Sequence, residues 1–390
     1  MSRPTTSAAV SSPGGAASTA ARPPASALPT RSVLAAQRRS AELELELARE
    51  PHRFRVLTGD RPTGPLHLGH YLGTLTNRVR LQRAGVEMFL VVADYQVITD
   101  RDVAGDVRGN VRELLLDYLA TGVAARGDGG AGEGSATIFT HSAVPALNQL
   151  LLPFLSLVSV AELQRNPTVK AEAAAAKASG GRSMSGLLLT YPVHQAADIL
   201  FCAANLVPVG QDQLPHLETT RLVARRFNDR YGSGERLLSE PEALLSPAPL
   251  LLGTDGAKMS KSAGNAVALR ADEDETARLI RSARTDAGRH ITYDPVRRPE
   301  VASLLLTAAL CAGTTPEALA GDIGAGGGAV LKRTVTEAVN EHLRPLRERR
   351  RELEGADDLL RGVLAAGNQH ANAVAARTLQ RVQEAMGMTY

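Results

Sequence analysis

Short runs of apolar, strand-forming residues alternate with amphipathic helical stretches through the first part of the sequence, and the alternation then stops. The expected order is a strand at 54–57, a helix at 67–84, a strand at 88–93, a helix at 103–120, a strand at 137–140 and apolar helix to about 163. In the first of these helices, offsets of three and four place five apolar side chains on one face: Leu68, Tyr71, Leu72, Leu75 and Val79. This alternation predicts parallel strands joined by right-handed helical crossovers, an α/β doubly wound parallel (Rossmann-like) sheet.

After residue 271 the strand patterns end, and helical patterns run almost to the end of the chain, at 302–310, 330–353 and 359–386. A chain of 390 residues also exceeds what one hydrophobic core usually organises. We therefore expect a disordered tail with a lead-in helix at 1–50, an α/β domain at 51–271 and a C-terminal all-α helical domain at 272–390. The lead-in helix should end at Pro51, because the residue before a proline is pushed away from helical angles.

The first 32 residues are rich in Ala, Ser, Pro and Gly, show no periodic apolar spacing and contain no acidic residue. Such a segment cannot offset its ordering entropy by burying apolar surface, so it is predicted to be disordered. An organellar transit peptide has the same Ser-rich and acid-poor composition, and this alternative stays open at the level of the sequence.

Charge and cysteine content exclude several classes of protein. A net charge of +3, from 44 basic and 41 acidic residues, is too balanced for a protein that coats nucleic acid nonspecifically. Cys202 and Cys311 are far apart in sequence, so neither a disulfide framework nor a zinc site is indicated, and a reducing cytoplasm is expected. The most apolar run, 150–160, is interrupted by Pro153 and is about half the length that crosses a bilayer, so no transmembrane segment is expected.

Residues 58–70, with the sequence Thr-Gly-Asp-Arg-Pro-Thr-Gly-Pro-Leu-His-Leu-Gly-His, connect a predicted strand through a glycine-containing turn to a predicted helix. Such a turn exposes backbone amides and the positive end of the helix at the carboxyl edge of the sheet, where phosphates bind. His67 and His70 are three residues apart and project from one helical face, so both can donate hydrogen bonds to a nucleotide. Either histidine alone would be interpreted as an ordinary surface residue, but the turn around them favours binding.

Residues 256–262, with the sequence Gly-Ala-Lys-Met-Ser-Lys-Ser, form a predicted loop about 190 residues after the first motif. Only five of the 44 basic residues are Lys, and two of them, Lys258 and Lys261, lie in this loop. Lys is a compact cation on a flexible stem, suited to following the charge of a departing pyrophosphate. The alternative, a solvated basic loop, becomes less attractive beside the histidine-containing turn.

Together the two motifs resemble the paired signatures of class I aminoacyl-tRNA synthetases. His-Leu-Gly-His resembles the His-Ile-Gly-His signature, Lys-Met-Ser-Lys-Ser matches the second signature in full, and the resemblance covers about residues 53–388. It implies catalytic roles for His67, His70, Lys258 and Lys261. It also implies ATP binding by Arg61, Pro62, Thr63, Gly69, His70, Gly210, Gln211, Asp212, Lys258, Met259, Ser260, Lys261 and Ser262.

Two further stretches, 189–200 and 207–213, resemble the amino-acid pocket of tryptophanyl-tRNA synthetases. The resemblance implies that Asp198 accepts a hydrogen bond from the indole N–H and that Tyr191 and Gln213 help to hold the substrate ammonium group. A carboxylate suits indole, which offers only a donor, and a carboxylate left unpaired would reject phenylalanine without an editing domain. Considered in isolation, Asp198 would be explained equally well by a helix cap or a core salt bridge.

Three residues depart from the common bacterial form of these enzymes, which has Thr, Asn and Met where this chain has His67, His70 and Gln195. The pattern is similar to a second, less common bacterial type of tryptophanyl-tRNA synthetase. A variant substrate pocket is therefore expected.

The resemblance implies ATP-dependent activation of L-tryptophan to tryptophanyl-adenylate, with release of pyrophosphate, and transfer of the tryptophanyl group to tRNA(Trp). Mg²⁺ bridging the ATP phosphates is expected with few protein ligands, and no dedicated metal-binding residue is predicted. A homodimer is also implied, with 150–160 as a candidate interface, although core burial would explain those residues as well. A tyrosyl-tRNA synthetase, a small-molecule adenylyltransferase and a non-catalytic synthetase-like paralogue remain alternatives.

Two segments outside the motifs also carry predictions. The basic run at 344–351 lies where the resemblance places the anticodon-binding domain, and its partners are either backbone phosphates or solvent on an ordinary helix face. Residues 166–181 are small and polar and are predicted to form a mobile loop that closes over the substrate.

Overall fold

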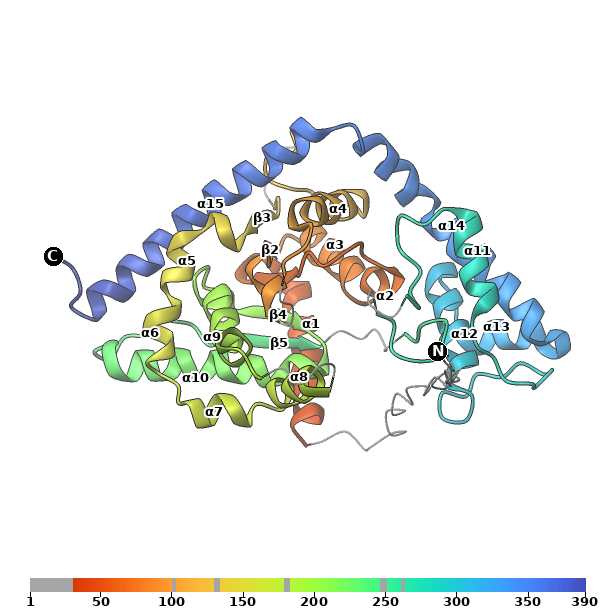
Figure 1. The fold of residues 1–390 in the computed structure, drawn as a ribbon, viewed down its shortest axis with the longest axis horizontal. Coiled ribbons are helices and arrows are strands. Elements are labelled where there is room, and N and C mark those ends of the chain that lie inside the picture. The colour runs from red at the N-terminus through yellow and green to blue at the C-terminus, as the bar shows by residue number, and fades with distance from the viewer. Residues whose placement is uncertain (1–30, 100–102, 130–133, 179–182, 246–250, 261–263) are drawn as a thin grey trace, which may run out of the picture.

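The computed structural model describes residues 31–99, 103–129, 134–178, 183–245, 251–260 and 264–390 (Figure 1). The disorder predicted for the start of the chain therefore lies outside the described residues, except for 31 and 32, which begin a helix. Lys261 and Ser262 of the second motif also lie outside them.

Five parallel strands form one sheet with the order β3-β2-β1-β4-β5. They are β1 (Arg55–Asp60), β2 (Glu87–Val92), β3 (Thr137–Thr140), β4 (Leu206–Val209) and β5 (Glu242–Leu245). The first three confirm the predicted strands, whereas β4 and β5 were not anticipated. The strand order changes direction between β1 and β4, as in a doubly wound sheet, and ligands bind at such a point.

Successive residues of a strand belong to two different hydrophobic cores. In β2, Met88 and Leu90 pack into one core, while Phe89 and Val91 pack into the other. The reason is that consecutive side chains of a strand point to opposite faces of the sheet. Both faces are therefore buried, which explains why β2 is apolar from Met88 to Val92 rather than alternating.

Helices and helical turns fill the connections between the strands. Up to β4 they are α1 (Arg31–Arg49), η1 (Pro51–Arg53), α2 (Leu68–His70), η2 (Tyr71–Leu75), α3 (Thr76–Arg83), η3 (Tyr95–Ile98), α4 (Val107–Ala120), η4 (His141–Ala143), α5 (Pro145–Gln149), α6 (Leu151–Leu155), α7 (Val160–Arg165), α8 (Pro167–Ala178) and α9 (Gly186–Leu200). After β4 they are η5 (Gln211–Gln213), α10 (Leu214–Tyr231), α11 (Glu273–Ser282), α12 (Pro299–Ala312), α13 (Pro316–Ile323), η6 (Gly324–Gly326), α14 (Gly327–Leu353) and α15 (Asp357–Ala385). The helical C-terminal region is thus confirmed, and α12, α14 and α15 correspond to its three predicted helices.

The loop predicted at 166–181 is wrong, because 167–178 form the helix α8. Oδ1 of Asn166 accepts hydrogen bonds from the backbone N–H groups of Thr168 and Val169, at 3.0 and 3.4 Å. These groups are free donors at the start of a helix, and a side-chain oxygen at this position stabilises the first turn. The alanine run that follows has high intrinsic helix propensity. Small residues therefore mark a helix here.

Two helices from opposite ends of the chain pack at the two edges of the sheet (Figure 1). α1 lies against β5 and buries Leu43 and Leu47 in the first core. α15 leaves the other C-terminal helices and crosses back to β3, as Figure 1 shows in dark blue. There Gly367 contacts the strand backbone so closely that a Cβ atom would lie 1.8 Å from the carbonyl oxygen of Ile138. The end of the chain therefore packs directly against the edge of the sheet.

The basic run in α14 contains a buried arginine that joins this helix to α4. Arg350 is only 5% exposed, and its guanidinium contacts three carboxylates, those of Glu113, Asp117 and Glu354. Arg347 is also buried, and burial lowers the pKa of its guanidinium. At Arg350 the run therefore fixes the helical region to the sheet, which neither sequence-level interpretation anticipated.

The apolar run at 150–160 divides between core and surface. Leu150, Phe154 and Leu157 are at most 1% exposed and belong to the second core. Leu152 and Val160 are 75% and 59% exposed. Core burial therefore explains one side of the run. The exposed side chains on the other side are still available for the predicted dimer interface.

Among the described residues no single helix is long and apolar enough to cross a membrane, and one pair of helices that passes by length and composition, 299–312 with 316–353, is bent by 108°.

Candidate functional site

A cleft of about 1200 Å³ opens at the carboxyl ends of β1 and β4, where the strand order changes direction. Its walls come from β1, α3, β2, α8, α9, β4 and the turn into α10. Five predicted site residues and the variant position Gln195 meet there: Arg61, Tyr191, Asp198, Gly210 and Gln213. Residues that are 150 apart in sequence therefore share one cavity at the expected place in the fold.

The other predicted site residues lie outside the lining of this cleft. They are Pro62, Thr63, His67, Gly69 and His70 of the first motif, Gln211 and Asp212 of η5, and Lys258, Met259 and Ser260 of the second motif. For Lys261 and Ser262 the structure describes no position. The site thus has two parts, the cleft and an adjoining region formed by the two motifs.

A buried ion pair fixes the end of β1, where the first motif begins. Oδ2 of Asp60 lies 2.6 Å from Nη1 of Arg78 and accepts a hydrogen bond from the hydroxyl of Tyr118 at 2.7 Å. Burial alone would raise the pKa of Asp60, but Arg78 and the nearby His70 outweigh burial and hold it well below its usual range. Arg78 also donates to the carbonyl of Gly59. Asp60 therefore remains charged and holds the start of the turn.

The two histidines of the first motif lie side by side at the start of α2. His67 is 7% exposed, so it is not the surface residue that the alternative interpretation required. The two rings are 3.8 Å apart between centroids, and the backbone N–H of His67 donates to Nδ1 of His70 at 3.3 Å. Gly69 leaves little space beside them, since a Cβ atom there would lie 3.1 Å from the His67 ring and 3.2 Å from Sδ of Met259.

The second motif packs against the first through its following residues. The backbone N–H of Leu68 donates to the carbonyl of Val267, and that of Leu269 donates to the carbonyl of Leu66, both at 2.9 Å. Met259 lies against the Gly69 turn. The chain therefore places the two motifs next to each other although they are about 190 residues apart in sequence.

Asn265, which the sequence analysis did not single out, organises the loop of the second motif. This side chain is 3% exposed, and its Oδ1 accepts the N–H of Ser260 at 2.9 Å. Its Nδ2 donates to the carbonyl of Lys258 at 3.1 Å and to Asp255 at 2.8 Å. The backbone of the loop is thereby held while the Lys258 side chain remains exposed.

A chain of hydrogen bonds orients Tyr191 in the cleft. Nδ2 of Asn166 contacts Nδ1 of His216 at 3.3 Å, and Nε2 of His216 contacts the Tyr191 hydroxyl at 3.0 Å. Because an amide nitrogen only donates, His216 accepts at Nδ1 and donates from Nε2 to Tyr191, which then donates to Glu172. Burial lowers the pKa of His216 to about 4, so this histidine is neutral. Glu172, another lining residue missed in the sequence, therefore lies beside Tyr191.

Asp198 projects from α9 into the cleft and is 4% exposed. Its Oδ1 atom lies 2.9 Å from Nε2 of His141, a fully buried histidine that follows β3 directly. Among the described residues this oxygen accepts no hydrogen bond of good geometry. The buried carboxylate therefore faces His141 on one side and lines the cleft on the other.

Comparison with known proteins agrees with this geometry. Residues 49–344 match the family described as tRNA synthetases class I (W and Y). The tryptophan–tRNA ligase of Treponema pallidum (strain Nichols) is 42% identical over 343 residues, which cover 86% of this chain and 97% of that protein. The ligase of Clostridium longisporum is 40% identical over 345 residues, with 86% and 97% covered. This chain belongs to the tryptophanyl-tRNA synthetase family.

A solved structure of the same family extends the match to three dimensions. The tryptophanyl-tRNA synthetase of Campylobacter jejuni, complexed with ADP and tryptophan, gives a TM-score of 0.70 at 28% identity. The match covers 85% of this chain and 99% of that one. The family fold therefore extends over both the sheet and the C-terminal helices.

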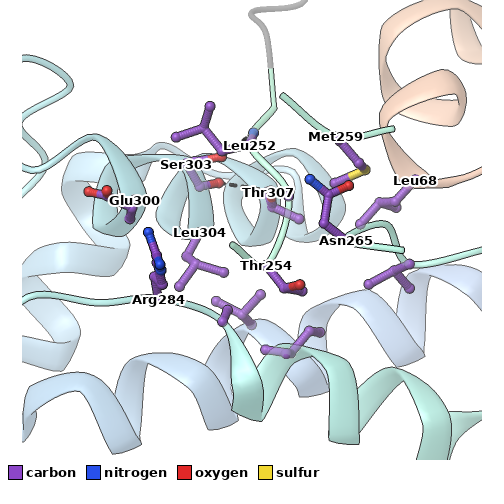
Figure 2. A pocket seen from close by; sticks show the side chains of 15 residues that line it. Leu68, Leu252, Thr254, Met259, Asn265, Arg284, Glu300, Ser303, Leu304 and Thr307 are labelled. Atoms are coloured by element: carbon purple, nitrogen blue, oxygen red, sulfur yellow. Dashed lines mark hydrogen bonds between the residues drawn. The ribbon is translucent and has the colours of Figure 1, made fainter. Parts of the chain in front are cut away.

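A second cavity, of about 470 Å³, separates the second motif from the helical region (Figure 2). Figure 2 shows Met259, Asn265 and Leu68 on one side of it and Arg284 and Glu300 on the other. A hydrogen bond joins α12 to the chain just before the second motif, because the hydroxyl of Ser303 accepts the N–H of Leu252 at 2.9 Å. The segment of the second motif is thus attached to the first motif on one side and, through Leu252, to α12 on the other.

Proposed function

We propose that this chain is a tryptophan–tRNA ligase, which activates L-tryptophan with ATP and transfers the tryptophanyl group to tRNA(Trp). The observation that carries the proposal is the buried Asp198 carboxylate, which lines a cleft at the switch point of the sheet. Relatives that are 40% identical or more bear this activity in their names. The tyrosyl alternative is disfavoured because the relatives compared above are named for tryptophan.

In this proposal the cleft holds the amino acid. Asp198 accepts the indole N–H, the only hydrogen-bond donor of that ring, and phenylalanine is rejected because it would leave the buried carboxylate unpaired. Tyr191 and Gln213 hold the ammonium group. Glu172 lies beside Tyr191 and adds a negative charge at the same end. The departure at Gln195, which lines the cleft, supports the predicted variant pocket of the second bacterial type.

The two signature motifs bind ATP and stabilise the charge of the leaving group. The tryptophan carboxylate attacks the α-phosphorus, the bond to the β-phosphate oxygen breaks, and pyrophosphate leaves with the electron pair. His67 and His70 donate to the phosphates, and Lys258 and Lys261 follow the pyrophosphate charge. Such positioning and charge stabilisation require no covalent nucleophile on the protein. The remaining ATP contacts are the predicted residues 61–63, 69, 210–212, 259, 260 and 262.

Mg²⁺ enters this proposal bound to the ATP phosphates. The side chains of the first motif are histidines and an arginine, which suit phosphate oxygens rather than a hard cation. Its one carboxylate, Asp60, is already engaged by Arg78 and Tyr118. The ion supplies further charge neutralisation to the phosphates when it is bound.

The helical region is proposed as the anticodon-binding part of the enzyme, with 51–271 as the catalytic domain and 272–390 as the helical domain. A cavity there is lined by five arginines and three carboxylates, an excess of two positive charges: Arg270, Arg344, Arg347, Arg350 and Arg351 with Asp272, Glu273 and Glu354. The functional form is proposed to be a cytoplasmic homodimer, with the exposed Leu152 and Val160 at the interface.

The deciding experiment is ATP–pyrophosphate exchange with tryptophan and tyrosine in parallel, followed by charging of tRNA. We expect exchange with tryptophan alone and charging of tRNA(Trp). Exchange that depends on tyrosine would overturn the substrate assignment. Exchange without charging would indicate an adenylyltransferase, and the absence of both would indicate a non-catalytic paralogue.

A further inference from the structure

His141 occupies a position that the proposed reaction has not yet used. It is fully buried at the carboxyl end of β3, and its Nε2 lies 2.9 Å from Oδ1 of Asp198. Asp198 lines the cleft, whereas His141 lies behind it. A buried carboxylate is costly unless a cation or several donors compensate it. His141 therefore supports the residue that faces the substrate.

The segment that carries His141 is held from behind by α15. Oδ1 of Asn368 accepts the backbone N–H of Thr140 at 3.0 Å, and Nδ2 of Asn372 donates to the carbonyl of Ala143. The backbone is therefore fixed on both sides of His141. Its ring position is set by the tertiary structure rather than by the local turn.

A second histidine, His194, lies beside His141, with 4.5 Å between ring centroids. Its Nδ1 contacts Nε2 of Gln96 at 2.7 Å, and its Nε2 contacts Oδ1 of Asn148 at 2.9 Å. Because an amide nitrogen donates and an amide oxygen accepts, His194 is the neutral tautomer with its proton on Nε2. Both of its nitrogens are occupied, so His141, His194 and Asp198 do not form an open metal site although they lie within ligand distance of one another.

The pKa values of the two histidines are shifted in opposite directions. Burial alone would lower the pKa of His141, but Asp198, with a smaller contribution from Asp94, raises it overall. Burial lowers the pKa of His194. Tyr95 is the other titratable side chain at the His141 ring, with 6.4 Å between centroids. Environments that separate two like groups in this way assign them different roles.

We propose that protonated His141 is a positioning residue, which balances the charge of Asp198 and orients its carboxylate toward the indole N–H of tryptophan. The inference rests on the proposed function, because it concerns how that same carboxylate recognises its substrate. Without His141, the buried carboxylate takes up a proton or turns away, and a protonated carboxyl is a poorer acceptor.

The first test is tryptophan-dependent ATP–pyrophosphate exchange by His141→Leu and His141→Gln. Losing a charged partner should raise the KM for tryptophan about 10- to 100-fold in His141→Leu, with a smaller change in kcat. His141→Gln keeps a donor without the charge and should lie between. His290→Gln, at an exposed histidine, is the matched control and should behave as the parent. An unchanged KM in folded His141→Leu overturns the proposal.

The pH profile separates this role from general structural support. Since the pKa of His141 is raised, its ion pair is complete at low pH and is lost as the pH rises through that pKa. The KM for tryptophan should therefore rise on the alkaline side in the parent more steeply than in His141→Gln. Identical alkaline limbs in the two proteins would contradict the inference.

A third measurement needs no variant. NMR of the full-length protein labelled with ¹⁵N-histidine should show two protonated ring nitrogens for His141 and one for His194 at neutral pH. A neutral His141 would overturn the inference. Failure of the proposed function would differ, because the parent would then show no tryptophan-dependent exchange while the NMR result could still hold.

Discussion

Two buried aspartates, Asp117 on α4 and Asp198 on α9, differ in how completely their oxygens are used. Asp117 is fully buried, with Oδ1 accepting from Nε of Arg350 and Oδ2 accepting from the N–H of Leu66, both at 3.1 Å. Asp198 is nearly as buried and faces His141 with Oδ1, but its carboxylate also lines the cleft. A saturated carboxylate, whose two oxygens are both bonded within the protein, holds parts of it together, whereas one that lines a cleft can receive a ligand.

The saturated carboxylate also connects distant parts of the structure. Leu66 directly precedes His67 of the first motif, and Arg350 belongs to the helical region. Asp117 therefore joins the turn of the first motif to α14 through two bonds. Burial raises its pKa even though Arg350 opposes the shift, which shows how completely water is excluded there.

The largest effect is expected from breaking the saturated pair. Arg350→Met leaves Asp117 buried without its cation and should lower the free energy of unfolding by about 3 to 5 kcal/mol. Arg351→Met, at the exposed neighbour on the same helix, should cost less than about 1 kcal/mol. Urea unfolding of both variants checks this, and equal losses would show that Arg350 has no special role.

Isosteric replacement of each aspartate tests the comparison directly. Asp117→Asn turns one acceptor into a donor that faces another donor and should cost about 3 kcal/mol of stability. Asp198→Asn should be less destabilising but should lower kcat/KM for tryptophan about 10- to 100-fold. Unfolding and ATP–pyrophosphate exchange are measured on both proteins. If Asp198→Asn proves the less stable of the two, the distinction between them is wrong.

The α15 contact supports the Asp198 side of the molecule from behind. In Gly367→Ala the new Cβ would lie 1.8 Å from the Ile138 carbonyl oxygen, so β3 or α15 must move, at a cost of about 2 kcal/mol. Because β3 leads directly to His141, the KM for tryptophan should rise as well. Gly362→Ala, on the same helix, has its nearest atom at 3.7 Å and should be neutral or slightly stabilising. Thermal melting and exchange assays compare the two.

The smallest effect concerns His216, whose pKa is shifted in the direction opposite to that of His141. Its pKa is lowered to about 4 by burial, so its contribution to stability is complete above the ordinary value of about 6.5 and is lost as the pH falls toward 4. His216→Gln should therefore flatten the acid limb of the stability profile, whereas His52→Gln, at an exposed site, should not. An unchanged acid limb in His216→Gln would assign that limb to other groups.

Elements with a long or regular pattern were predictable from the sequence. The strand at 137–140 and the helices of the C-terminal region agree closely with the structure. β4 and β5 are as short as β3 but were missed, because β4 contains Pro208 and β5 consists of residues that favour helix over strand. Residues 166–181 were misassigned because a run of alanine fits either a flexible segment or a helix until the capping Asn166 is considered.

The residues of the candidate site also divide into those that the sequence predicts and those that it does not. Asp198, Tyr191 and Gln213 lie in motifs, so the sequence alone predicts them as pocket residues, and all three line the cleft. Asn265 lies three residues after the second motif, in a short polar loop. This position is a sequence signal that could have identified it as part of the site. His141 follows a predicted strand at its carboxyl end, where ligand-binding residues gather, and this signal was overlooked.

The sequence by itself determined the alternation of elements, the two motifs and the kind of chemistry they perform, because each depends on residues that are close together in the chain. Only the tertiary structure decided how the buried charges are paired. Arg350 meets Asp117 across 233 positions, and His141 meets Asp198 across 57. Whether a buried carboxylate stabilises the fold or receives a substrate depends on which donors surround it, and those donors come from distant segments that only folding brings together.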